Sequence, residues 1–214
     1  YDEKTQEWPK VFTKGDSDKS YEILVEATGF GLAPVKPEGS AVTYDSHVQQ
    51  STTTLTNVTY ALGCIVTEEE IDDNKYEKMG RFRARALGFS MRQTKEVVAA
   101  NILNRAFDSN YLGGDGKELA ATDHPTVNGT QSNELSPAAD FSEAALEALL
   151  VQISNARNSR GLRIALTGKK LVVPPELQFD ANRIVNSTLR AGTPNNDINA
   201  QKYMGMLPDG VFVY

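Results

Sequence analysis

A proline-free stretch from Thr67 to Phe107 constrains the fold of this chain more than any other feature. It begins Thr67-Glu68-Glu69-Glu70, in which the Thr67 hydroxyl can accept from a helical N–H, Glu70 can reach back, and carboxylates lie at the positive end of the helix dipole. At about 1.5 Å per residue, the predicted helix is on the order of 60 Å long, more than a compact domain of this size needs. We therefore expect it to span or brace something large. Apolar residues recur mostly at steps of three and four, as one helix face requires; they are Ile71, Met79, Phe82, Ala86, Phe89, Val97, Val98, Ile102 and Phe107.

The predicted helix also carries glycines and charges. Gly80 and Gly88 each weaken a helix by about 1 kcal/mol relative to alanine, so we interpret them as a bend or a close crossing. Acidic residues gather at the helix start, and arginines follow in its middle. We interpret these charges as a solvent face with ion pairs rather than as a phosphate site. The arginines are Arg81, Arg83, Arg85 and Arg92.

Length and charge limit the function classes. A chain of 214 residues allows one large domain or two small ones, and a formal charge of −6 argues against a generic nucleic-acid binder. The sequence opens at Tyr1 and closes on an apolar run, so we expect a processed chain or a portion of something longer. Cys64 is the one cysteine, which excludes a disulfide within the chain and fits a reduced cytosolic setting. No leader or apolar span predicts secretion or membrane insertion.

The residues before the helix predict an arm and a hairpin. Residues 1–20 are polar, and we expect them to be ordered by docking, with Trp8 as the anchor. Apolar and polar residues alternate over 21–26 and again over 57–66, which predicts two half-buried strands, with Cys64 as a small buried hydrophobe. The Thr-rich stretch between them favours extended backbone, so we predict that residues 21–66 form a long two-stranded hairpin that leaves the body of the protein. Its exposed edges call for a partner surface to cover them.

The second half of the chain is predicted to be mixed α and β with its own core. A loop and a polar segment occupy 109–139, and a helix begins at Asp140 or Ser142 and ends near Gly161. A strand over 170–173 is followed by a helix that Pro174-Pro175-Glu176 opens. After a polar loop over 190–199, Pro208-Asp209-Gly210 turns into a last strand.

The residues give no positive sign of an enzyme, and we predict no catalytic, cofactor-binding or metal-binding residues and no cofactor. Asp123 next to His124 suggests an oriented base, but no nucleophile motif accompanies it, so a hydrolase using this pair stays an alternative. His47 is expected to be exposed. Gly113-Gly-Asp-Gly116 lacks the ending of a phosphate loop and follows a helix. Asp115 with Asp123 could hold calcium, although no regular loop of alternating oxygens is present.

A series of short stretches resembles the major capsid (head) proteins of tailed bacteriophages with the Hong Kong 97-type fold, and in particular the Mu-like head-subunit group. They occur in the order that family has them and cover roughly residues 12 to 210. The stretches are Gly29-Phe-Gly-Leu-Ala-Pro34, Thr67-Glu-Glu-Glu-Ile-Asp-Asp-Asn74, Arg83-Ala-Arg-Ala-Leu87, Ser90-Met-Arg-Gln-Thr-Lys-Glu96, Asn104-Arg-Ala-Phe107, Gly113-Gly-Asp-Gly116, Lys170-Leu-Val-Val-Pro-Pro-Glu-Leu177 and Asn196-Asp-Ile-Asn199.

The resemblance implies an α+β fold of the Hong Kong 97 type. Its parts would be an N-terminal arm at 1–20, an extended β-hairpin or E-loop at 21–66, and a spine helix of the peripheral domain at 67–108. A peripheral loop region would follow at 109–139, and an axial domain with a return strand at 140–214. Members of the family usually continue beyond the point where this sequence stops.

The resemblance also implies a structural protein that forms pentamers and hexamers of an icosahedral head around double-stranded DNA, and not an enzyme. Assembly contacts would come from the hairpin and the arm, through Trp8, Phe30, Leu32, Pro34, Lys36, Val42 and Tyr44. Gly80 and Gly88 would bend the spine, and Arg81, Arg85 and Arg92 would face DNA without sequence specificity. Some members crosslink a lysine to an asparagine of a neighbour. Lys36 lies near the hairpin tip, but nothing in this chain identifies such a partner.

Partners implied by the resemblance are copies of the chain itself and other head proteins such as portal, scaffold or decoration proteins. The resemblance implies no membrane partner. The expected location is the virion, with assembly in the cytoplasm of the bacterial host. A shell of the encapsulin type has the same fold and holds cargo enzymes in place of a genome, and it stays as the second interpretation.

Overall fold

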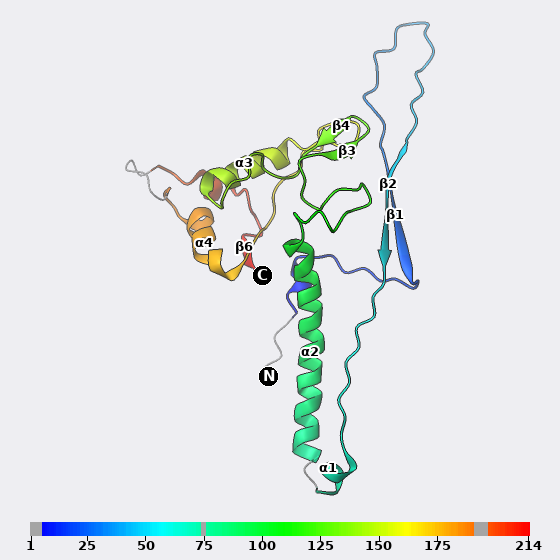
Figure 1. The fold of residues 1–214 in the computed structure, drawn as a ribbon. Helices are drawn as coiled ribbons and strands as arrows, with labels where there is room; N and C mark the ends of the chain where they lie inside the picture. The colour runs from blue at the N-terminus through cyan, green and yellow to red at the C-terminus, as the bar shows by residue number, and fades with distance from the viewer. Residues whose placement is uncertain (1–5, 74–75, 191–196) are drawn as a thin grey trace. The chain divides into compact units, whose positions relative to one another are not determined.

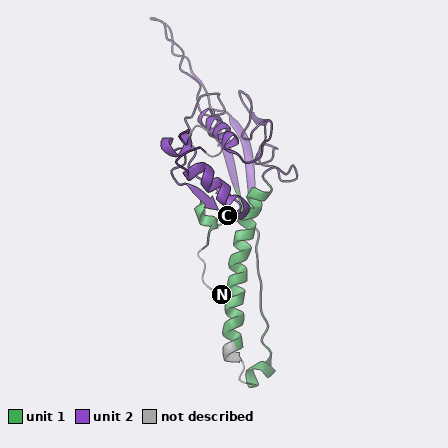
Figure 2. Cartoon of the chain, turned by 90° about the vertical axis from the view of Figure 1, so that its left-hand side faces the viewer, with its two compact units in different colours: residues 1–22, 55–105 green, residues 23–54, 106–214 purple. Residues whose placement is uncertain are grey.

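The computed structural model describes residues 6–73, 76–190 and 197–214 and has mixed helix and strand content (Figure 1). The chain divides into two compact units (Figure 2). Unit 1 comprises residues 1–22 and 55–105, and unit 2 comprises residues 23–54 and 106–214. The division of the family-based expectation into peripheral and axial domains stays a prediction.

Two helices of unit 1 replace the single helix predicted over 67–107. Helix α1 is Glu68–Asp72 and α2 is Tyr76–Asn104. The capping box is confirmed, because the Thr67 hydroxyl accepts from the Glu70 N–H and the Glu70 carboxylate accepts from the Thr67 N–H, both at 3.4 Å. The prediction of one helix is wrong, because α1 ends at Asp72 with Asp73 as its C-cap at ψ 0°, and aspartate is a weak helix former. The 29 residues of α2 span about 44 Å.

The apolar residues of α2 follow the predicted spacing, but they are largely exposed within the chain. Met79, Phe82 and Phe89 are 48%, 52% and 40% exposed, and Ala99 is buried. Spacing at three and four residues places apolar groups on a common face, but a second layer must exist to bury that face. Among the described residues of unit 1, the arm and the segment 57–66 cover only part of it.

Two strands form the base of the predicted hairpin. Strand β1 is Tyr21–Ala27 and β2 is Gln49–Thr56. Hydrogen bonds from Asn57 to Ser20 and from Thr28 to Val48 bracket the pair, which is the pattern of an antiparallel hairpin. The Thr-rich stretch thus forms the second strand. The prediction that one face of these strands is buried is wrong, because the alternating residues Tyr21, Ile23 and Val25 are 50–55% exposed.

The prediction of a strand over 57–66 is wrong. This segment carries no strand and runs along α2 within unit 1 (Figures 1 and 2), where the Ile65 carbonyl accepts from Arg83 at 3.2 Å. Its alternation does not reflect burial, since Val58 and Leu62 are 68% and 55% exposed. Cys64 is exposed as well, so the prediction that it is a small buried hydrophobe is wrong.

Unit 2 has a small core between two helices and a parallel pair of strands. Helix α3 is Glu143–Ser154, the 3-10 turn η2 is Pro175–Leu177, and α4 is Gln178–Asn186. Strand β5, Leu171–Val173, pairs in parallel with β6, Val211–Val213. The predicted strand over 170–173, the helix opened by prolines and the last strand are confirmed. The core consists of Leu146, Leu150 and Val185, packed against Leu171, Ile184, Met206, Leu207 and Val211.

The start of α3 is as predicted, and its end is not. The Ser142 hydroxyl caps the helix by accepting from the Ala145 N–H at 3.2 Å. The helix ends at Ser154 rather than near Gly161, because residues 157–163 form a separate turn. The Asn158 side chain organises that turn, since its Oδ1 accepts from the N–H groups of Arg160 and Leu162 at 3.0 and 2.8 Å.

Three short elements were not predicted from the sequence. Strands β3, His124–Thr126, and β4, Gly129–Gln131, form a tight antiparallel hairpin around Asn128. Helix α5, Ala200–Met204, is capped by Asn199, whose side chain is almost fully buried and also donates to the Ile184 carbonyl at 2.6 Å. The predicted loop over 190–199 lies partly outside the described residues.

Candidate functional site

The hairpin continues past β1 and β2 as a segment that extends away from the rest of unit 2 (Figures 1 and 2). We call residues 28–31 and 45–48 the neck and residues 32–44 the tip segment. A turn from Pro37 to Ser40 reverses the chain, with Gly39 at φ +78°, a left-handed conformation that glycine adopts without strain. Every residue of the tip segment is exposed.

The predicted assembly residues of the hairpin lie in the tip segment, except Phe30, which lies in the neck and is also exposed. Leu32 and Tyr44 are 83% and 92% exposed, and Phe30 and Val42 are each 60% exposed. Pro34 and Lys36 are exposed as well, and so is His47, as expected. Fully burying one large apolar side chain is worth about 1.5–3 kcal/mol, so this surface would gain substantially from a partner.

Hydrogen bonds hold the two sides of the neck together. Thr28 is 3% exposed, and it donates its N–H to the Val48 carbonyl and accepts the Val48 N–H on its hydroxyl, both at 2.9 Å. The Asp45 carboxylate accepts from the N–H groups of Gly31 and Ser46 at 2.9 and 2.8 Å. These two bonds, with the charge of Arg160, outweigh partial burial and hold the pKa of Asp45 below its ordinary value.

Arg160 joins the neck to the turn that follows α3. Its Nε donates to the Gly29 carbonyl at 3.1 Å, and its Nη2 donates to the Ser46 carbonyl. The same nitrogen lies 3.6 Å from Asp45 Oδ1. The guanidinium therefore contacts the chain both before and after the tip segment.

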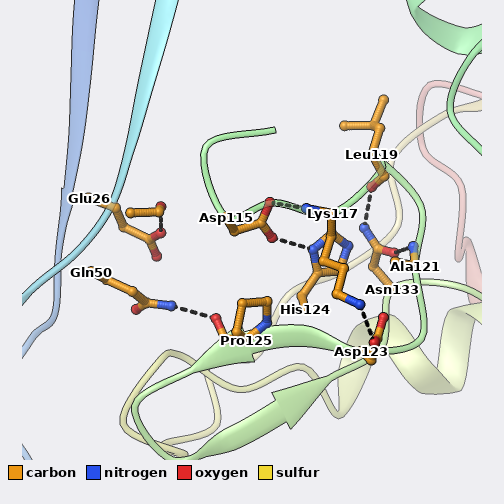
Figure 3. A network of polar contacts seen from close by, with 11 residues as sticks. Glu26, Gln50, Asp115, Lys117, Leu119, Ala121, Asp123, His124, Pro125 and Asn133 are labelled. Atoms are coloured by element: carbon orange, nitrogen blue, oxygen red, sulfur yellow. Dashed lines mark hydrogen bonds and ion pairs between the residues drawn. The ribbon is translucent and has the colours of Figure 1, made fainter. Parts of the chain in front are cut away.

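A second set of contacts holds β2 to the loop after α2. The Gln50 side chain donates to the Pro125 carbonyl at 2.8 Å, as Figure 3 shows. Gly114 lies so close to β2 that a Cβ there would be 2.7 Å from the Thr52 carbonyl oxygen. Glycine at position 114 is thus required by the close approach of two backbones.

The loop itself is held by a polar network (Figure 3). His124 Nδ1 and Asp115 Oδ2 lie 2.6 Å apart, and Lys117 pairs with Asp123. The Asn133 side chain accepts from the Ala121 N–H and donates to the Leu119 carbonyl. Burial raises the pKa of Asp115, but the hydrogen bond from His124, the Lys117 N–H and the charge of His124 bring it below its ordinary value.

This network corrects the predicted pairing of Asp123 with His124. The carboxylate beside His124 is Asp115, and Asp123 is held by Lys117, so the two neighbouring residues do not form a dyad. Each candidate calcium ligand has a hydrogen-bonding partner of its own, His124 for Asp115 and Lys117 for Asp123. Among the residues that the structure describes, no group of three His, Cys, Asp or Glu side chains could hold a metal ion.

In unit 1 the predicted ion pairing of the helix arginines is confirmed for one of them. Arg83 makes two bonds to the Glu70 carboxylate, at 2.7 and 2.6 Å. This hydrogen-bonded pair lowers the pKa of Glu70. Arg81 and Arg85 are exposed and Arg92 is half-buried, and a role of these three toward DNA stays a prediction.

The arm docks on α2 through its backbone. At the start of the short 3-10 turn η1, Trp8–Lys10, the Glu96 carboxylate accepts from the N–H of the N-cap Glu7 at 2.7 Å and from the N–H of Trp8 at 3.0 Å. Trp8 is half-buried at this point. Its predicted role in contacts between copies stays a prediction. Gly80 and Gly88 both lie within α2.

Comparison with known proteins identifies the family. A family model described as phage capsid protein matches residues 50–213. The chain belongs to the phage capsid protein family. No curated protein matches the sequence.

Solved structures share the fold of this phage capsid protein. A capsid of bacteriophage JBD30 decorated with minor capsid protein trimers matches with a TM-score of 0.67 and 13% identity, over 99% of this chain and 90% of that chain. A second bacteriophage JBD30 capsid structure matches with a TM-score of 0.68 and 14% identity, over 92% and 86%. The protein is therefore a structural protein of the phage capsid. In the described part of the chain, no helix has the length and apolar character needed to cross a membrane.

Sequence reasoning missed the residues that hold the hairpin of this capsid protein, namely Arg160, Asp45, Gln50 and Gly114. The paired glycines Gly113-Gly114 were a usable signal of a close backbone approach. Nothing in the sequence near Arg160 points to a partner at Gly29, because the two positions are 131 residues apart.

Proposed function

We propose that this protein is the major capsid subunit of a tailed phage, with the Hong Kong 97-type fold of the Mu-like head-subunit group. It assembles into pentamers and hexamers of an icosahedral head that encloses double-stranded DNA. The observation that carries the proposal is the tip segment, which exposes Leu32, Val42 and Tyr44 in a chain of the phage capsid family. A surface of this kind is unfavourable in water and favourable against a partner.

The partner that we propose for the tip segment is an adjacent copy of the chain. A hairpin that leaves its own subunit can lie over a neighbour, and in a closed lattice every subunit both gives and receives this contact. Each contact can be weak, because assembly into a shell multiplies it. The arm with Trp8 would add a second contact with another copy, and Pro34 and Lys36 would belong to the hairpin contact.

Helix α2 would act as the spine of the subunit. Its exposed apolar stripe would be covered by neighbouring parts of the shell, and Gly80 and Gly88 would let it bend while the shell matures. Arg81, Arg85 and Arg92 would face packaged DNA and contact phosphates without reading sequence. An Arg92→Glu variant that still packages DNA normally would contradict this role.

Other proteins of the phage head are proposed as further partners. The JBD30 capsid is decorated with minor capsid protein trimers, and we propose that the shell of this protein likewise accepts portal, scaffold or decoration proteins. Assembly would take place in the cytoplasm of the bacterial host, and the mature location is the virion. The role is structural, and we propose no catalytic step.

Negative-stain electron microscopy of the purified chain tests the proposal. Monodisperse shells, or rings of five or six subunits, are expected. A uniformly monomeric protein at high concentration would contradict the proposal. Shells that hold protein cargo in place of DNA when purified from an infected host would point to an encapsulin-type compartment.

A further inference from the structure

The neck has a direct connection to the turn after α3, and that connection is the Arg160 side chain. Its guanidinium bonds the carbonyls of Gly29 and Ser46, which lie on opposite sides of the hairpin. Arginine suits this task because its donors form a planar fork that reaches two acceptors at once. The neck cannot turn relative to Arg160 without loss of at least one of these bonds.

Asp45 links this connection to the hydrogen bonds within the neck. One carboxylate oxygen accepts from the Gly31 N–H at 2.9 Å, and the other lies 3.6 Å from Arg160. Arg160 therefore holds the neck through two carbonyls and one charge. The side chain of Arg160 is 20% exposed and that of Asp45 is 44% exposed, so water weakens the ion pair. The two hydrogen bonds from Arg160 to the carbonyls therefore do most to hold the neck in position.

The turn that carries Arg160 is itself held firmly. The Asn158 side chain accepts from the Arg160 N–H at 3.0 Å, and the Asn158 carbonyl accepts from the Gln131 side chain of β4 at 2.9 Å. Arg157 donates to the Gly161 carbonyl at 2.8 Å and closes the turn. Arg160 thus transmits the position of β4 and of the end of α3 to the neck.

We propose that Arg160 is a latch that fixes the direction in which the tip segment leaves unit 2. With the latch closed, as in this structure, the tip segment points along one direction. With the latch open, the neck bonds between Thr28 and Val48 lose this support and open more often, and the neck swings about its base. The inference rests on the proposed function, because direction matters only when the tip segment must meet a neighbouring copy. Arg160 is accordingly a positioning residue for assembly.

Hydrogen–deuterium exchange on the purified chain tests the latch without reference to assembly. In Arg160→Ala, exchange of the hydrogen-bonded neck amides, those of Thr28, Gly31, Ser46 and Val48, should rise roughly tenfold, as expected when a charge-assisted hydrogen bond to the neck is lost. Exchange in α3 and α4 should stay as in the wild type. Unchanged exchange across the neck would overturn the latch.

Two variants sharpen the comparison. Arg160→Lys keeps the charge but not the planar fork, so neck exchange should rise nearly as much as in Arg160→Ala; protection as in the wild type would show that charge alone suffices and would overturn the forked contact. The Arg160→Lys variant also tests the latch if Arg160→Ala fails to fold. Arg183→Ala removes an exposed arginine whose partner is Asp180, far from the neck in sequence, and should leave neck exchange unchanged.

Electron microscopy of the same variants tests the consequence for assembly. Arg160→Lys should give fewer closed shells and more irregular sheets or partial shells, although its tip segment is intact and its thermal unfolding is close to that of the wild type. A variant with a freed neck that still builds normal shells would overturn the role of the latch in assembly and leave the proposed function intact. Normal shells after loss of the tip segment would instead overturn the proposed function.

Discussion

The Nε atom of Arg160 donates a hydrogen bond to the carbonyl oxygen of Gly29 at 3.1 Å, across 131 positions of the sequence. Through this bond the base of the hairpin is positioned by the turn that follows α3. The contact from Gln50 to Pro125 and the approach of Gly114 to Thr52 hold the hairpin from a second segment of unit 2. The exposed tip segment therefore grows from a base that is fixed at several points.

Gly114→Ala should destabilise the contact between the loop and β2. The added Cβ would lie 2.7 Å from the Thr52 carbonyl oxygen, so one backbone must move. We expect a loss of about 1–3 kcal/mol in the free energy of unfolding, measured by urea denaturation. Gly63→Ala is the control, because a Cβ at Gly63 meets nothing within 4 Å. Equal stability of the two variants would show that the approach at Gly114 is not tight.

Asp115→Asn should lower stability at neutral pH and not at acidic pH. The pKa of Asp115 lies below its ordinary value in the folded chain, so the paired carboxylate stabilises the fold above about pH 4. This stabilisation is lost as the pH falls through the folded pKa. We expect a difference from the wild type of about 1–2 kcal/mol near neutrality, decreasing toward zero in acid. Asp45 and Glu70 titrate alike in both proteins, and a difference that is constant with pH would contradict the His124–Asp115 pairing.

Glu96→Ala should release the arm from α2. The variant loses the acceptor of the Glu7 and Trp8 N–H groups. Trp8 is the single tryptophan of the chain, so its fluorescence reports the release directly. We expect a red shift of the emission and stronger quenching by acrylamide, while Lys95→Ala, one position earlier and exposed, should resemble the wild type. An unchanged spectrum in Glu96→Ala would mean that the carboxylate does not hold the arm.

Gly88→Ala should stabilise the isolated chain and impair the shell. A Cβ at Gly88 meets nothing within 4 Å, so alanine should strengthen α2 by about 1 kcal/mol in urea unfolding. If α2 bends at Gly88 during maturation, the stiffer helix should trap shells in an immature form under the electron microscope. Ala84→Gly, at an exposed position of the same helix, is the matched opposite change. Normal mature shells from Gly88→Ala would argue against a bend there.

Local signals in the sequence predicted much of the fold. Thr67 and Ser142 cap helices as expected, and Pro174-Pro175 opens α4 by way of η2, because these effects depend on residues within one turn of each other. The alternation over 57–66 predicted the wrong strand. The pairing of β1 with 49–56 is decided by hydrogen bonds at the neck, which the pattern of apolar residues does not report.

Part of the candidate site could also be predicted from the sequence, and part of it could not. Exposure of Leu32, Val42 and Tyr44 follows from the shortage of core-forming residues around them, so the tip segment could be predicted. The clamp of Arg160 on Gly29 could not, because it depends on the three-dimensional position of a turn over a hundred residues away. Asp115 was missed as the partner of His124 because adjacency in sequence favoured Asp123.

Assembly of a chain without the tip segment tests the central claim most directly. Gly31 and Asp45 already meet at 2.9 Å between N and Oδ2, so a short Gly-Ser linker can replace residues 32–44 without disturbing the neck, β2 or the Arg160 contacts. We predict a folded chain with wild-type thermal unfolding that forms no closed shells under negative-stain electron microscopy. Closed shells of normal size from this chain would contradict the claim that the tip segment joins neighbouring copies.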